Sequence, residues 1–208
     1  LTTIYVESNW IHDGGSFNDT SMFEGAVSLV GGAGTVYDMY RIDYNYAHID
    51  EGEDNPGYFS NYAEPYAVLT DNEDGTTKTL TFYYDYQKAE HTNALSIGPF
   101  SYVASLDSNK DKITAVVFDE SFDNYKKLTS TYYWFSYCKN LATITGIEYL
   151  HTDNVTNMGQ MFNQCESLTS LDVSHFNTEK VTNMNLMFCS CSKLTVLDVS
   201  GFNTANVY

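Results

Sequence analysis

Residues Val181–Tyr208, VTNMNLMFCSCSKLTVLDVSGFNTANVY, repeat the residues before them, Val155–Val181, VTNMGQMFNQCESLTSLDVSHFNTEKV. Positions 26 residues apart carry the same side chain, as the pairs Met158 and Met184 or Phe162 and Phe188 do. The other identical pairs include Met161/Met187, Cys165/Cys191, Leu168/Leu194, Leu171/Leu197, Asp172/Asp198, Val173/Val199 and Phe176/Phe202. So close a match indicates an internal repeat, in which each unit buries its apolar side chains against the next.

One repeat unit has two halves, each with its own pattern of apolar residues. The apolar residues of its first half have the i, i+3, i+4, i+7 spacing of one helix face: Met184, Met187, Phe188 and Cys191. In the second half, Leu194–Ser200, the residues Leu197 and Val199 alternate with Val196, Asp198 and Ser200, which is the period of a strand. One strand plus one short helix per unit is typical of a leucine-rich repeat. We therefore expect an α/β fold, a leucine-rich-repeat solenoid with a β-rich spacer or cap.

The same spacing occurs in two other places. The earlier copies are Trp134-Phe135 with Cys138, Leu141 and Ile144, and Met22-Phe23 with Ala26 and Leu29. The units 154–177 and 181–203 resemble the repeats of BspA-like leucine-rich-repeat surface proteins. That resemblance implies surface display, attachment to host matrix or to other cells, and no enzymatic activity.

The chain also resembles a junction between two repeat arrays, because segments of the closing type precede segments of the opening type. We expect residues 1–60 to hold a terminal repeat and a closing segment, and residues 108–208 to hold a second array. Residues 61–107 are expected to form a β-hairpin spacer, in which Asp74-Gly75 marks the turn between two strand-like runs. A further strand is expected over Ile113–Phe118.

The charge excludes several classes of partner. The 208 residues include 27 acidic and 10 basic ones, for a formal net charge of −17. Such a surface repels nucleic acid and anionic membranes, and it suits an acidic extracellular protein that stays soluble by repulsion. No apolar run is long enough to span a bilayer. We expect a cell-surface location, with any anchor outside this chain.

No catalytic motif is found, so we expect a protein that is not an enzyme. No cofactor is expected, and calcium binding is left as an alternative at Asp107–Asp111 or Asp50–Asp54. Cys138, Cys165 and Cys191 share one repeat phase and are expected to form a buried column of free thiols, with a bridge between rungs as the alternative. Cys189 is out of phase and is expected to be exposed.

Candidate binding residues lie on the outward side of the predicted strands, on the concave face. They are Ser170, Asp172, Ser174, Val196, Asp198 and Ser200. Tyr132 and Tyr133 are possible aromatic anchors. The expected function is a non-catalytic protein-binding or adhesion module whose partners are surface or matrix proteins of a host or neighbouring cell. Two alternatives remain: a self-associating surface-layer or filament component that pairs through exposed repeat ends, and a carbohydrate-binding protein.

Overall fold

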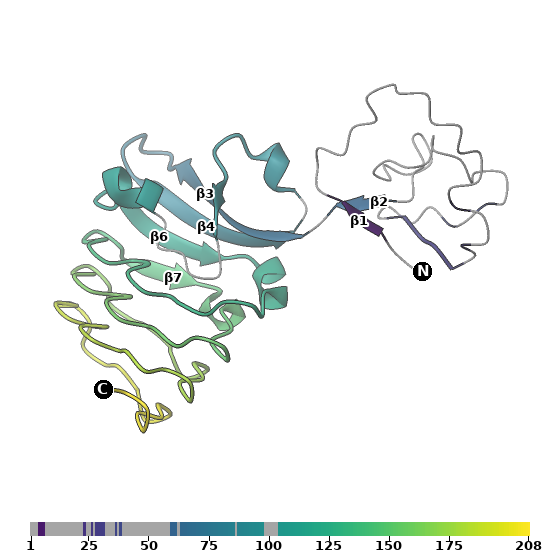
Figure 1. Ribbon diagram of the computed structural model, residues 1–208. Coiled ribbons are helices and arrows are strands. Elements are labelled where there is room, and N and C mark those ends of the chain that lie inside the picture. The colour runs from purple at the N-terminus through teal and green to yellow at the C-terminus, as the bar shows by residue number, and fades with distance from the viewer. Residues whose placement is uncertain are drawn as a thin grey trace. The chain divides into compact units, whose positions relative to one another are not determined.

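The computed structural model describes residues 4–6, 23, 26, 28–31, 36, 38, 59–61, 63–85, 87–97 and 104–208. The chain forms two compact units, Leu1–Ala63 and Glu64–Tyr208. The second unit consists of a sheet followed by stacked coils that continue to the C-terminus (Figure 1). The acidic cluster Asp50–Asp54 and the segment 7–22 lie outside the described residues.

A mixed five-stranded sheet opens the second unit, with strand order β5-β3-β4-β6-β7. Its strands are β3 (Glu64–Asp71), β4 (Lys78–Asp85), β5 (Leu95–Ser96), β6 (Ile113–Phe118) and β7 (Thr143–Thr145). The pairs that include β3 are antiparallel, whereas β4 with β6 and β6 with β7 are parallel. The sheet thus includes strands from both sides of residue 107.

The hairpin and the third strand agree with the sequence prediction. β3 and β4 pair in register around a turn in which the Gly75 backbone is left-handed, with φ of +64°. The Asp74 carboxylate accepts hydrogen bonds from the backbone N–H groups of Thr76 and Thr77, both at 2.7 Å. β6 has the bounds expected for it, and its side chains at Ile113, Val116 and Phe118 are buried.

Three coils follow the sheet: residues 130–156, 157–182 and 183–208. Parallel bridges join Ser130 to Asn157 and Asn157 to Asn183. Alternate backbone N–H groups of one coil donate to carbonyl groups of the next, as from Tyr133 to Gly159 at 3.1 Å and from Phe162 to Met187 at 2.9 Å. The intervening N–H groups close four-residue turns within their own coil, as from Cys165 to Phe162 at 3.1 Å.

These hydrogen bonds show that the predicted helix-plus-strand solenoid is wrong. The helices among the described residues are short 3-10 turns: η2 (Lys88–Glu90), η3 (Ala104–Asn109), η4 (Glu120–Asn124) and η5 (Ile147–Tyr149). In an α-helix every N–H bonds along its own axis, whereas here half of them bond to the neighbouring coil. The turns also contain left-handed residues, such as Gln160 and Gln164 with φ of +56° and +59°, which an α-helix does not accommodate.

The strand predicted in the second half of each repeat is absent from the last two coils. Only the first coil contributes one, as β7. Within residues 111–208 no backbone hydrogen bond joins 168–174 to 194–200, so these segments lie side by side without forming a ladder. The inward pattern is nevertheless right, because Met158, Met161, Phe162 and Cys165 are all fully buried.

Aromatic rings carry the core from the sheet into the coils. Phe82 of β4 stacks on Phe118 of β6 and on Trp134 of the first coil, with ring centroids 4.7 and 5.1 Å apart. Phe135 contacts Phe162 at 5.6 Å. The sheet and the coils therefore share one core.

Part of this construction is present in the first unit. There the N–H of Ala26 donates to the carbonyl of Phe23 at 3.0 Å, and the N–H of Leu29 donates to the carbonyl of Ala26 at 2.8 Å. The coils of the second unit contain the same pair of turns. Phe23 and Leu29 are buried, as Phe162 and Leu168 are. β1 (Ile4–Val6) pairs in parallel with β2 (Phe59–Asn61).

Candidate functional site

The candidate binding surface begins on the sheet and continues into the coils. Strand pairing aligns Thr79, Ala115 and Thr143 in one column, and Thr81, Val117 and Thr145 in the next. The repeat offset extends these columns into the second and third coils. Their members there are Ser170 and Val196 in the first column, and Asp172 and Asp198 in the second. We call the outward side of these two columns the ladder face.

A shallow depression lies on the ladder face, with a volume of about 540 Å³. Each of the three coils contributes to it: Thr145 and Glu148 from the first, Ser170 and Asp172 from the second, and Val196 from the third. Val196 is 77% exposed. The depression thus combines two carboxylates and two hydroxyls with one exposed apolar side chain.

The aspartates of the ladder face are held in place by the backbone two residues further on. Asp172 accepts a hydrogen bond from the Ser174 N–H, and Asp198 accepts one from the Ser200 N–H, both at 2.9 Å. Hydrogen bonds from Ser174 and Ser200 lower the pKa of the respective carboxyl groups. Both groups therefore stay charged at a lower pH than an ordinary aspartate.

A second depression, of about 470 Å³, is lined by acidic residues and by Tyr149 of η5. Its carboxylates come from Asp119, Glu120 and Asp123, while Tyr149 at the end of η5 forms another part of the wall. The Nε2 atom of His151 lies 2.7 Å from Asp123 Oδ1, and the hydrogen bond with His151 lowers the pKa of Asp123. Carboxylates thus line both of the depressions that η5 borders.

The residues predicted from the sequence have different places on this surface. Ser170, Asp172 and Val196 line one depression together. Asp198 lies one rung beyond Asp172, and Ser174 and Ser200 are exposed residues whose N–H groups orient the aspartates. Thr145 and Glu148 were missed, although the offset of 27 residues from Asp172 to Thr145 was available as a signal.

The two predicted aromatic anchors contact each other on another part of the first coil. The rings of Tyr132 and Tyr133 lie 5.7 Å apart, and Tyr137 extends the group at 5.9 Å from Tyr133. Tyr132 and Tyr137 are 38% and 41% exposed. Tyr137 was missed, although it lies four residues from Tyr133 in an aromatic-rich stretch.

The cysteine prediction is confirmed for Cys138, Cys165 and Cys189, whereas Cys191 is less buried than the predicted column requires. All four cysteines are free, Cys138 and Cys165 are buried, Cys191 is half-buried and Cys189 is exposed. The Sγ atoms of Cys165 and Cys191 contact the carbonyl oxygens of Phe135 and Phe162, one coil back, at 3.2 and 3.1 Å. Burial raises the pKa of Cys138 to about 12.

The described part of the chain lacks two other kinds of feature. Among these residues no cluster of three or more His, Cys, Asp or Glu side chains is arranged to hold a metal ion. Nor do they include a helix with the length and apolar character needed to cross a bilayer.

Comparison with known proteins corrects the family assignment. No curated protein and no solved structure matches the chain. The resemblance to BspA-like leucine-rich-repeat surface proteins is wrong, because a different family matches and nothing in the comparisons supports those repeats. What the chain is similar to, over residues 107–208, is a family described as Mycoplasma protein of unknown function, DUF285.

Proposed function

We propose that this chain is a non-catalytic protein-binding module of the adhesive kind, and that its ladder face takes a basic segment of a partner protein. The observation that carries the proposal is the depression in which three successive rungs place Glu148 and Asp172 around the exposed Val196. A partner on the surface or in the matrix of a host or neighbouring cell suits such a module.

Charge supports a basic partner. The carboxylates of Asp119, Glu120 and Asp123 line the second depression that η5 borders and add to the negative surface. With a net charge of −17, the whole chain attracts cationic ligands over long range, and the ladder face directs them to a specific place. Exposed carboxylates mostly raise the association rate and the specificity for a basic partner. We therefore expect binding that weakens as salt is added.

The spacing of the rungs supports an extended ligand. Successive coils stack through the parallel bridges from Asn157 to Ser130 and to Asn183. The ladder face repeats a polar side chain from coil to coil at Thr145, Asp172 and Asp198. Lysine or arginine side chains of an extended peptide can each meet one carboxylate, while the aliphatic part of a side chain covers Val196. No catalytic step is assigned to any of these groups.

Binding of a short synthetic peptide of alternating lysine and serine tests the proposal. We expect saturable binding by the intact chain, measured by fluorescence anisotropy, and a loss of about tenfold in the Asp172→Asn/Asp198→Asn variant. The Glu73→Gln/Glu179→Gln variant removes the same formal charge from exposed sites outside the ladder face and serves as the matched control. Equal weakening in both variants would show that only overall charge matters, and would overturn the assignment to this face.

Display at the cell surface is the second part of the proposal, and the strong acidity supports it. It is tested by adding a protease to intact cells that produce the protein. Loss of the protein while a cytoplasmic marker stays intact is the expected result, and equal protection of both proteins would contradict it.

A further inference from the structure

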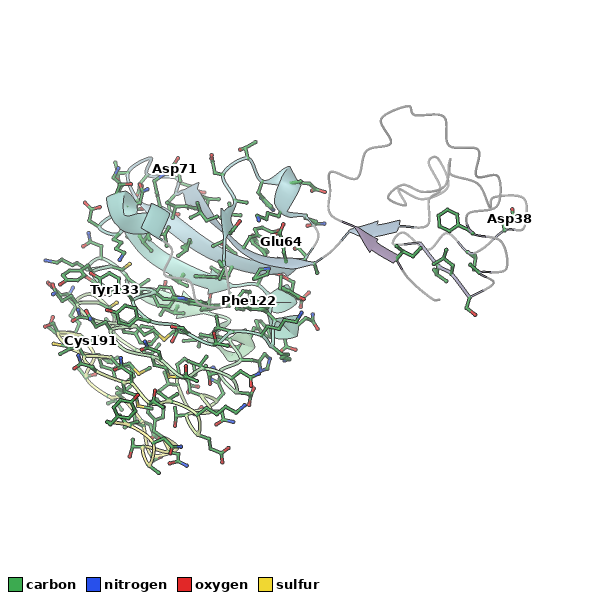
Figure 2. All side chains as sticks on the ribbon, in the orientation of Figure 1. Asp38, Glu64, Asp71, Phe122, Tyr133 and Cys191 are labelled. Carbon is green, nitrogen blue, oxygen red and sulfur yellow. The ribbon has the colours of Figure 1, made fainter. Side chains whose placement is uncertain are left out.

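A second surface of the coils differs from the ladder face in both charge and side-chain type. It is built from the turn segments 130–140, 157–167 and 183–193, which we call the turn face. Figure 2 shows Tyr133 of the first of these segments and Cys191 of the third on the same side of the stack. Together these segments contain Lys139, Glu166 and Lys193 as their charged residues, and Lys139 and Glu166 lie 3.6 Å apart. These segments thus carry a formal charge of only +1 in a chain of net charge −17.

A strip of aromatic rings lies on the turn face in the first coil. Tyr133 lies between Tyr132 and Tyr137, with ring centroids 5.7 and 5.9 Å away. Lys110 Nζ lies 4.2 Å from the centroid of the Tyr133 ring. Because Tyr132 and Tyr137 are 38% and 41% exposed, the strip presents aromatic surface to a ligand.

The next coil places amide side chains beside these rings. Gln160 Nε2 donates a hydrogen bond to the Tyr132 hydroxyl at 3.3 Å, and Gln160 Oε1 accepts one from Asn163 Nδ2 at 3.3 Å. Gln164 occupies the position that corresponds to Tyr137, one coil on. Amides offer both donors and acceptors, which is what hydroxyl groups require of a partner.

We propose that the turn face binds a neutral glycan. The apolar faces of its sugar rings stack on Tyr132 and Tyr137, and its hydroxyl groups bond to Gln160 and Gln164. The neutral class follows from charge, since an anionic glycan is repelled by the chain as a whole, while the turn face has almost no carboxylates to attract a cation. The rings and amides thus offer stacking and hydrogen bonds without an ion pair.

The backbone holds the strip in place before any ligand arrives. Tyr133 and Tyr137 have left-handed backbone, with φ of +66° and +67°, which is unusual for bulky side chains. Their N–H groups donate to Gly159 and Asn163 of the next coil at 3.1 and 2.8 Å. A platform fixed in this way loses little conformational entropy on binding.

The chain itself supplies substitutions that fit this backbone. Tyr137→Gln gives the first coil the residue that the second coil carries at that position, and Tyr132→Asn gives it the residue of the third coil, Asn185. Gln164 already adopts a left-handed φ of +59°, so Tyr137→Gln is compatible with the fold. Tyr208→Gln changes a tyrosine that is 97% exposed outside the turn face and is the matched control.

The test is an array of neutral hexose and N-acetylhexosamine oligomers printed beside sialylated and sulfated glycans. A neutral oligomer that binds is then titrated by calorimetry. We expect binding of at least one neutral oligomer and of no anionic one, with affinity lowered about tenfold by Tyr137→Gln and more by the double variant. Tyr208→Gln and Asp172→Asn/Asp198→Asn should bind as the unsubstituted chain does, which separates this proposal from the one for the ladder face.

Three results would overturn it. The first is an array on which no neutral glycan is bound. The second is neutral-glycan affinity that stays unchanged in the Tyr132→Asn/Tyr137→Gln variant while circular dichroism shows that the variant is folded. The third is a protein partner whose binding is lost in that variant while no glycan binds, because that would make the turn face a protein contact.

Discussion

Phe162 and Phe188 stack with ring centroids 5.7 Å apart and ring planes inclined by only 5°. The two residues are 26 positions apart in the sequence and occupy the same place in successive coils. Phe135 precedes them in the stack, 5.6 Å from Phe162. The column of rings converts the sequence repeat into a continuous core, and it fixes the spacing of the rungs that form the ladder face.

Truncation of this column should have an effect that depends on position. Phe162 is fully buried and Phe188 is half-buried. We therefore expect Phe162→Ala to lower the free energy of unfolding by about 3–5 kcal/mol and Phe188→Ala by about half of that. Urea unfolding followed by circular dichroism measures both. Equal losses in the free energy of unfolding would mean that the contribution of each ring does not depend on how deeply it is buried.

Gly146 should be intolerant of any side chain. It has φ of +69°, and a Cβ there would overlap the carbonyl oxygen of Phe118. We expect Gly146→Ala to cost about 3 kcal/mol or more, from backbone strain and overlap together. Gly75 is the control, because it has φ of +64° with open space around it, and Gly75→Ala should cost about 1–2 kcal/mol. Thermal unfolding of the two variants compares them, and a similar loss in both would contradict the overlap.

In acid, the side chain of Asp74 should no longer stabilise the hairpin turn, because its carboxylate becomes protonated. Hydrogen bonds from Thr77, and then from Thr76, lower the pKa of Asp74 from 3.8 to about 2. A lowered pKa means that the stabilisation is complete above the unfolded value and is lost as the pH falls from about 4 to about 2. The difference in Tm between the unsubstituted chain and Asp74→Ala should therefore shrink across this window. Glu73→Ala, which changes an exposed neighbour, is the control, and a constant difference for Asp74→Ala would refute the assignment.

The four thiols should react in the order of their exposure. Burial raises the pKa of Cys138 to about 12 and also raises that of Cys165, so both stay protonated near pH 8. We expect iodoacetamide to modify the exposed Cys189 first and Cys191 more slowly, and to reach Cys138 and Cys165 only after unfolding. Mass spectrometry of peptides at timed intervals measures this order. Early labelling of Cys165 would show that the coils open in the folded state.

The sequence predicted burial better than it predicted secondary structure. The inward positions of the repeat, the β3–β4 hairpin and the bounds of β6 follow from local patterns of apolar residues and from Asp74-Gly75. The helix prediction was wrong because i, i+3, i+4 spacing shows only which side chains share a face. It does not show which carbonyl group accepts the hydrogen bond of each backbone N–H. In the coils half of these donors bond to the next coil, and left-handed residues such as Gln160 make this possible.

Only part of the candidate site was accessible from sequence. Ser170, Asp172 and Val196 were found because they alternate with buried residues in the repeat. Glu148 belongs to η5, which interrupts the repeat pattern. The carboxylates of Asp119 and Asp123 come to line the second depression, beside Tyr149, only through tertiary structure. Local spacing carries no information about such neighbours.

Backbone amide signals, followed by NMR during titration with the lysine–serine peptide, locate the basic ligand on the protein. A basic ligand on the ladder face should shift the signals of residues 143–148, 170–174 and 196–200, and leave those of 130–137 unchanged. Shifts confined to the turn segments, or spread evenly over all exposed acidic residues, would contradict a binding site on the ladder face.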